Sequence, residues 1–131
     1  MMKKYFLLFL LFSIYSFAQK KEYNFKYVYY VLTNKTTGQE QVFPTGTDAV
    51  VIYDTFYKSY ETVWTDSKNF RGGNKFEYLR DEEEMKLVQE ETSKELYRAY
   101  HLESKNIFVL APIKLNKGMI VLIWFTNFKR E

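Results

Sequence analysis

Aromatic and β-branched residues recur at every second position over short stretches of this chain, and this pattern limits its fold more than any other feature. Every second residue from Tyr23 to Val31 is aromatic or β-branched. A period of two places such side chains on one face of a β-strand, because successive strand residues point to opposite faces of a sheet. The pattern therefore predicts β-structure.

Similar stretches follow one another to the end of the chain, separated by residues typical of turns. We expect turns at 34–38, at 44–48 with its Pro and Gly, and at 66–74 with its Gly-Gly pair. Residues 116–118 join two apolar runs and end in Gly, which predicts a hairpin. The nine predicted strands are residues 23–31, 41–43, 49–56, 59–65, 75–79, 85–87, 96–102, 107–115 and 119–125.

The segment 81–103 allows two interpretations. Its Glu, Lys, Leu, Met and Gln residues are good helix formers. Large side chains also recur at every second position from Leu96 to Leu102, as in a strand. We expect two strands here. The alternative is an α+β fold in which a helix over roughly 81–103 packs on an antiparallel sheet.

Many short strands joined by short turns favour pairing between neighbours in the chain. Closing such a meander into a barrel of about eight or nine strands removes its exposed edges. The layout resembles the calycin group, which contains the lipocalins and fatty-acid-binding proteins. Lipocalins carry a Gly-x-Trp motif on the first strand, whereas the two tryptophans here are Trp64 and Trp124. We therefore predict one all-β, antiparallel, calycin-like barrel and assign no family.

Residues 1–18 have the three parts of a cleavable secretory signal peptide. A Lys pair supplies the positive start, an apolar run follows, and the small residues Ser16 and Ala18 precede the cleavage site. The apolar run is shorter than the roughly 20 residues that a membrane-spanning helix needs. The end of this leader resembles those of exported proteins of the Bacteroidota.

Cleavage after Ala18 would leave a single β-rich domain, residues 19–131. We expect this domain to be secreted, into the periplasm or out of the cell, with no membrane span after cleavage. Gln19 stands where a lipoprotein requires a cysteine for lipid attachment. The sequence therefore predicts a protein that is not a lipoprotein.

Charge and composition exclude several kinds of partner. Removing the leader takes away two lysines and lowers the net charge from +3 to +1. A nearly neutral domain lacks the basic surface that binds nucleic acid. The chain has no cysteine, which excludes disulfides and thiolate metal centres. We expect no nucleic-acid partner, no metal site and no cofactor.

Arg98 is the residue that most suggests a binding site. As part of a strand it shares a face with Leu96, Tyr100 and Leu102, and a charge among apolar neighbours must be paired or hydrogen-bonded. One interpretation makes Arg98 the anchor for an anionic head group. The other makes it a structural residue that caps the barrel or pairs with Glu77 or Asp54. The residues of the first interpretation are Arg98 and the aromatic walls Tyr60, Trp64, Tyr78 and Tyr100.

Other residues that could carry chemistry have ordinary structural explanations. His101, the only histidine, has Glu103 two residues on, but a general base also needs a nucleophile or an orienting group. Asp54 and Glu61 could form a carboxylate pair of the glycosidase type. The acidic run 81–84 lacks the spacing of a calcium loop. We expect no catalytic residue and no enzyme activity.

The remaining classes of function are two. The first is a secreted, non-enzymatic binding module that holds a small apolar or glycan-like ligand on its aromatic side chains. The second is an interaction or structural domain of the cell envelope that binds another protein through a sheet edge or face. A barrel filled by its own side chains would favour the second, because it leaves no internal cavity for a ligand.

Overall fold

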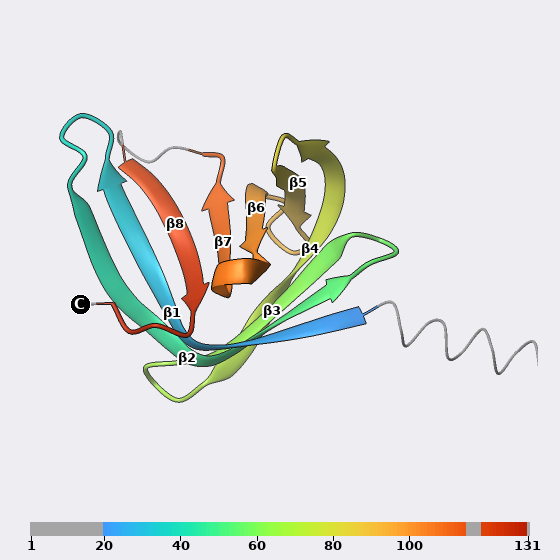
Figure 1. The fold of residues 1–131 in the computed structure, drawn as a ribbon, viewed down its shortest axis with the longest axis horizontal. Helices are drawn as coiled ribbons and strands as arrows, with labels where there is room; N and C mark the ends of the chain where they lie inside the picture. Colours follow the sequence, from blue (N-terminus) through green and yellow to red (C-terminus); the bar gives the residue numbers. More distant parts are fainter. Residues whose placement is uncertain (1–19, 115–118, 131) are drawn as a thin grey trace, which may run out of the picture.

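The computed structural model describes residues 20–114 and 119–130, in which eight antiparallel strands close into a barrel (Figure 1). This confirms the predicted all-β barrel. Strand neighbours in the barrel are neighbours in the chain, and β8 returns to pair with β1. The elements are β1 (Lys20–Asn34), β2 (Glu40–Asp54), β3 (Ser59–Asp66), β4 (Arg71–Glu82), β5 (Met85–Glu90), β6 (Leu96–Leu102), the short 3₁₀ helix η1 (Glu103–Lys105), β7 (Ile107–Pro112) and β8 (Met119–Thr126).

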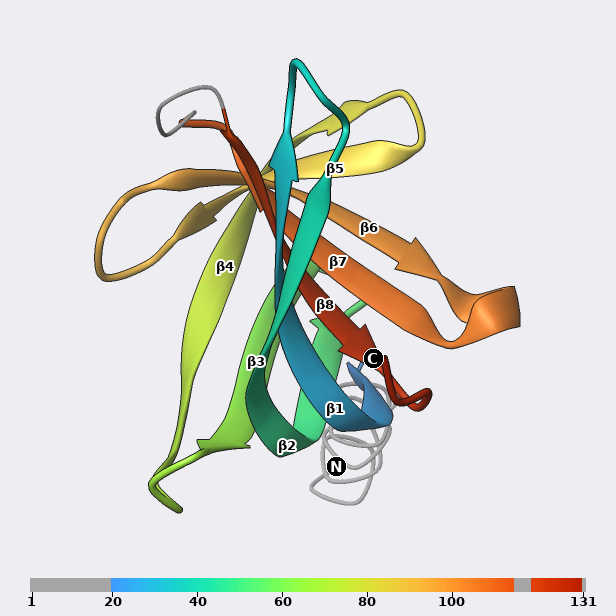
Figure 2. The same cartoon turned by 90° about the vertical axis from the view of Figure 1, so that its left-hand side faces the viewer.

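The first strand closes the barrel because it pairs with both β2 and β8. It pairs with β2 from Lys20 opposite Asp54 to Thr33 opposite Glu40. Its second half also pairs with β8, from Tyr27 opposite Thr126 onward. Figure 2 shows β8 beside β1 where the barrel closes. No sheet edge is therefore left along this half of β1.

The segment 81–103 contains strands β5 and β6 joined by a turn, so the helical alternative is wrong. Glu90 organises that turn. Its carboxylate accepts hydrogen bonds from the Asn74 side chain (2.9 Å) and from the backbone N–H groups of Thr92 and Ser93. Burial alone would raise the pKa of Glu90, but these hydrogen bonds outweigh it and the pKa is lowered. The connection between β5 and β6 is thus a turn built on one carboxylate.

Residues 44–48 are not a turn, because 41–43 and 49–54 belong to one long strand, β2, which ends two residues before the predicted end at 56. Pro44 fits there because pairing with β3 begins only at Gly46, so β2 has no second neighbour at Pro44. The register shifts between Thr47 and Val50, and Asp48 has a φ of 51°. The turn-forming residues therefore bend a continuous strand, and the nine predicted strands become eight.

Residues 66–74 contain a turn, but it is shorter than predicted and the two glycines lie beyond it. Asp66 closes the turn, its Oδ1 accepting hydrogen bonds from the N–H groups of Lys68 (2.9 Å) and Phe70 (3.0 Å). Gly72 and Gly73 already belong to β4, where Gly73 pairs with Val63 of β3. The Gly-Gly pair is thus a feature of the sheet.

The alternation from Tyr23 to Val31 does not keep to one face. A bulge shifts the register between Val28 and Tyr29. Phe25 and Val28 belong to the central core cluster, whereas Tyr29 and Val31, although also buried, lie on the opposite face of the strand beside Trp124 and Leu122. One additional residue in the strand exchanges the two faces, because the side-chain period is two.

Side chains from every strand fill the middle of the barrel. The rings of Phe25, Phe108 and Phe125 are at most 2 % exposed, and Phe125 lies 6.2 Å from Phe25 and 5.5 Å from Phe108 between ring centroids. Barrels of about eight strands have an interior just wide enough for side chains. The core consists of Phe25, Val28, Ala49, Val51, Tyr60, Phe76, Val88, Ala99, Phe108, Leu110 and Phe125.

The predicted hairpin at 116–118 and the predicted signal peptide both lie outside the described residues. The strands on either side of 116–118 do pair antiparallel, with Ile107 opposite Thr126 and Leu110 opposite Ile123. Within 20–114 and 119–130, the structure contains no helix of the length and apolar character needed to cross a membrane.

Candidate functional site

One end of the barrel gathers polar and aromatic side chains that face inward. At this end β1, β3, β5 and β7 begin and β2, β4 and β6 finish. We call it the tyrosine end, and define it by five residues on five strands. They are Tyr23 on β1, Tyr53 on β2, Tyr60 on β3, Lys86 on β5 and His101 on β6.

The rings of the tyrosine end pack in two pairs. Tyr53 stacks on Tyr60 with 4.8 Å between ring centroids, and the Lys86 ammonium lies 5.3 Å from the centre of the Tyr53 ring. Tyr23 meets His101 edge to face at 4.4 Å. Phe108 of β7 lies beneath both pairs, 5.0 Å from Tyr60 and 5.7 Å from His101. The cluster therefore rests on the filled core.

The three phenols stay protonated at neutral pH. Burial, followed by the hydrogen bond to Glu103, raises the pKa of Tyr23 to about 12. Its hydroxyl donates to Glu103 Oε1 over 2.8 Å. Burial also raises the pKa of Tyr60 and, with the nearby Asp81 carboxylate, that of Tyr53. Each phenol can thus act as a hydrogen-bond donor.

His101 is a neutral imidazole in this setting. Burial lowers its pKa, and the Lys86 ammonium acts in the same direction, while the Glu103 carboxylate opposes both. Its Nε2 atom is buried and has no hydrogen-bond partner in the described part of the chain. Catalysis by His101 would need a nucleophile beside it, and its ring neighbours are Tyr23 and Phe108.

We predict that His101 makes the barrel less stable in mild acid. The unfolded chain binds a proton at the ordinary pKa of 6.5, and the folded chain binds it only at a lower pH. The contribution of His101 is therefore fully present above about pH 6.5 and is lost as the pH falls through the folded-state pKa. Urea unfolding at pH 7.5 and 5.5 should show a smaller loss of stability for His101→Gln than for the unmodified chain. Equal losses would contradict the prediction.

The structure does not bring the five residues predicted from the sequence into one site. Tyr60 belongs to the tyrosine end. Tyr78 lies close to it, since its phenol contributes to the raised pKa of Tyr53 and the Lys58 ammonium sits 5.1 Å from its ring centre. Trp64 packs edge to face on Phe125 at 5.6 Å, away from that end.

Arg98 and Tyr100 lie on the outer face of the barrel. The inward face of β6 carries Ala99 and His101, so the residues between them point outward. Arg98 Nε donates to Glu82 Oε2 over 2.8 Å, and Arg80 binds the other oxygen of the same carboxylate at 3.1 Å. The partner of Arg98 is thus Glu82, where we expected Glu77 or Asp54.

The hydrogen bonds from Arg98 and Arg80 lower the pKa of Glu82. Glu82 belongs to the acidic run 81–84, so the cations that pair with this run include Arg80 and Arg98 of the protein itself. Among the described residues, no three His, Asp or Glu side chains are grouped so that they could hold a metal ion.

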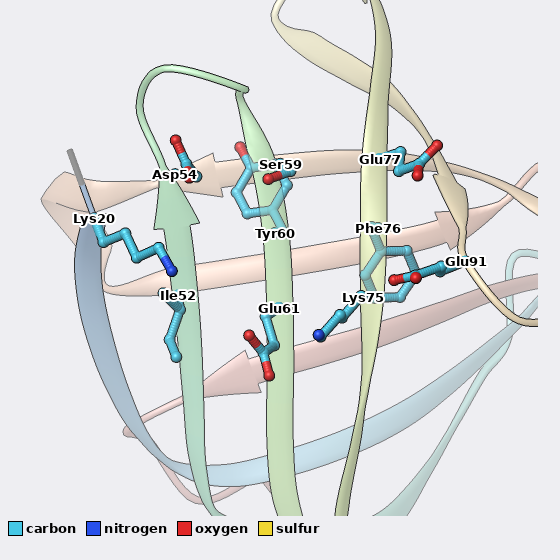
Figure 3. Close-up of a pocket in the computed structure, with 10 residues that line it drawn as sticks. All are labelled: Lys20, Ile52, Asp54, Ser59, Tyr60, Glu61, Lys75, Phe76, Glu77 and Glu91. Atoms are coloured by element: carbon cyan, nitrogen blue, oxygen red, sulfur yellow. The ribbon is translucent and has the colours of Figure 1, made fainter. Parts of the chain in front are cut away.

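A pocket of about 190 Å³ lies on the outer surface of β2, β3 and β4 (Figure 3). Ile52, Glu61 and Lys75 line its middle, and Lys75 extends from β4 toward Glu61 on β3. Asp54 is at the rim, where its Oδ1 accepts hydrogen bonds from the N–H groups of Phe56 and Tyr57 at 3.0 and 3.1 Å. The suggested Asp54–Glu61 pair therefore shares a pocket, but Asp54 closes a turn.

Another part of the outer face carries a row of apolar side chains. Directly paired residues run across five strands: Tyr100, Val109, Trp124, Tyr29 and Pro44. The outer face of an antiparallel sheet is usually polar, because it is the face in contact with solvent.

Arg130 covers one part of this row. Its guanidinium lies 4.7 Å from the Trp124 ring centre and pairs with the Glu40 carboxylate at 3.3 Å. Its backbone N–H donates a hydrogen bond to the Tyr29 hydroxyl over 3.0 Å. Arg130 thus ties β8, β1 and β2 together on the outside.

No protein-family model, curated protein or solved structure matches this chain.

Proposed function

We propose that this protein is a non-enzymatic binding module that holds a small apolar or glycan-like ligand at the tyrosine end of its barrel. The observation that carries the proposal is the gathering of Tyr23, Tyr53, Lys86 and His101 at one end. All four are half-buried, so each is reachable from solvent yet held by packing. We further propose that the chain is exported by its leader and acts in the periplasm or outside the cell.

The filled core limits where such a ligand can bind. Phe25, Phe108 and Phe125 close the middle of the barrel, so the proposed ligand lies on the end rather than inside. Aromatic rings offer flat apolar faces to a naphthyl ring or to the face of a sugar, and phenol hydroxyls can bond its polar edge. The hairpin between β2 and β3 adds two exposed rings at the same end, Phe56 and Tyr57.

Binding of two probes tests the proposal. The probes are 1-anilinonaphthalene-8-sulfonate, followed by fluorescence, and chitotriose, followed by saturation-transfer NMR. We expect at least one to bind the folded chain, and Tyr53→Ala to weaken it at least about tenfold, which corresponds to roughly 1.4 kcal/mol. Tyr30→Ala is the matched control, because Tyr30 is a partly exposed tyrosine toward the other end of β1.

Near-ultraviolet circular dichroism should show that each variant keeps its native packing. The proposal fails if neither probe binds the folded chain. It also fails if Tyr53→Ala and Tyr30→Ala weaken binding to the same extent.

A protein partner is the second candidate, and both the filled core and the apolar outer row favour it. Tyr100, Val109 and Trp124 form a continuous apolar strip on three neighbouring strands. Apolar patches on a monomer surface commonly mark interaction sites. A filled barrel that binds neither probe would make this strip the stronger candidate.

A further inference from the structure

We propose that the ligand of the tyrosine end carries an anionic group on a flat apolar body, and that Lys86 is the cation that binds this group. A carboxylate, sulfate or phosphate would satisfy the same chemistry. The inference rests on the proposed function, because it names the class of ligand that the tyrosine end would take.

Lys86 faces the interior although it is a lysine. On β5 it lies two residues before Val88, which is fully buried in the core, so both side chains share the inward face. Its ammonium lies 5.3 Å from the centre of the Tyr53 ring. Lysines are depleted from such positions unless the charge has a partner.

The described residues do not supply Lys86 with an ion pair. Their ion pairs within 4.0 Å join Arg80 and Arg98 to Glu82 and Arg130 to Glu40. Asp81 is directly opposite Lys86 on β4, but it is exposed and forms no such pair. Glu103, the other carboxylate at this end, accepts the Tyr23 hydroxyl proton in a hydrogen bond. A half-buried ammonium is therefore left for a ligand.

The phenols beside Lys86 can donate hydrogen bonds to a bound group. The rings of Tyr53 and Tyr60 stack on each other, and both phenols remain protonated at neutral pH. An ammonium and two phenol hydroxyls favour a group that only accepts hydrogen bonds, as an ionised carboxylate, sulfate or phosphate does. The half-buried rings of Tyr23 and Tyr53 supply the flat apolar contact for the body of the ligand.

Two fluorescent probes that share one apolar body test this assignment. 1-Anilinonaphthalene-8-sulfonate carries a sulfonate, whereas N-phenyl-1-naphthylamine is its neutral counterpart. We expect the full chain to bind the sulfonate at least about tenfold more tightly, and this preference to weaken as salt is added. Lys86→Met removes the charge, keeps an unbranched side chain only one atom shorter, and should reduce the preference to less than about threefold.

Lys75→Met is the matched control, because Lys75 is also a strand lysine but lines the outer pocket. It should leave the preference unchanged. Equal affinity for the two probes, or a preference that survives Lys86→Met, would overturn the inference while the proposed function stands. If neither probe nor chitotriose binds the folded chain, the proposed function fails and this inference fails with it.

Discussion

Gly73→Ala is expected to prevent the barrel from forming its β3–β4 pairing. A Cβ atom at Gly73 would overlap the carbonyl oxygen of Thr62, and would lie 2.7 Å from Thr62 C and 2.9 Å from Val63 Cα. These are backbone atoms held by the sheet, so they cannot rotate away as a flexible side chain could. We expect a loss of more than about 3 kcal/mol, at the upper end for overpacking, from a total of about 5–15 kcal/mol.

Urea unfolding followed by far-ultraviolet circular dichroism measures this loss. Gly72→Ala is a close control, since a Cβ atom at Gly72 would meet nothing within 4 Å. That variant should unfold within about 0.5 kcal/mol of the unmodified chain. If the two alanine variants unfold at the same urea concentration, the close approach of β3 and β4 at Gly73 is not real.

Phe108→Ala is expected to have the second largest effect. Phe108 is 0 % exposed, and its ring contacts Tyr60, Phe125 and His101. Removing it takes away the floor of the tyrosine end and leaves a cavity, at a cost of about 3–5 kcal/mol. For a domain of this size the melting temperature should fall by more than about 10 °C.

Phe56→Ala provides the comparison, because Phe56 is 64 % exposed at the tip of a hairpin. Its melting temperature should change by no more than a few degrees, since isolated surface substitutions rarely shift stability by more than about 0.5 kcal/mol. A Phe108→Ala variant that melts like Phe56→Ala would show that the aromatic core is not packed as described.

The class of fold was predictable because the alternation of side chains recurs along the chain. The face that each strand buries was harder to predict. On β6, Leu96, Tyr100 and Leu102 make the more apolar face in sequence, yet the face with Ala99 and His101 is the one inside. Both faces carry large side chains, so hydropathy alone does not distinguish them. The pairing of β6 with β5 and β7 decides which face is buried, and that pairing depends on the closed barrel.

Local turn signals misled the prediction wherever glycine or proline served the sheet. Pro44 and Gly46 look like a turn, but they lie within β2 at a bend. Gly73 looks like part of a loop, but its missing side chain lets β4 approach β3. In both places the conformational preference was identified correctly from the sequence. The role of the proline or glycine was not identified, because it depends on a neighbouring strand that is distant in the sequence.

The tyrosine end could not be assembled from the sequence for a related reason. Tyr23, Tyr53, Lys86 and His101 are spread over nearly eighty residues, and only the strand registers bring them together. None of the four lies beside a sequence motif that indicates a binding site. Of the residues singled out for ligand binding, Tyr60 is the one that belongs to this cluster, and it is buried there.

The return of β8 to β1 has a consequence for how the chain must be made. A ribosome releases β1 first and β8 last, so the second half of β1 waits for most of synthesis before its partner exists. Contacts this distant in sequence form slowly, because a long loop must close first. Until then β1 and β7 each present a free edge to other chains. A nascent or truncated chain lacking its last strand is therefore the form most exposed to aggregation, and folding is completed only when residues 119–126 arrive.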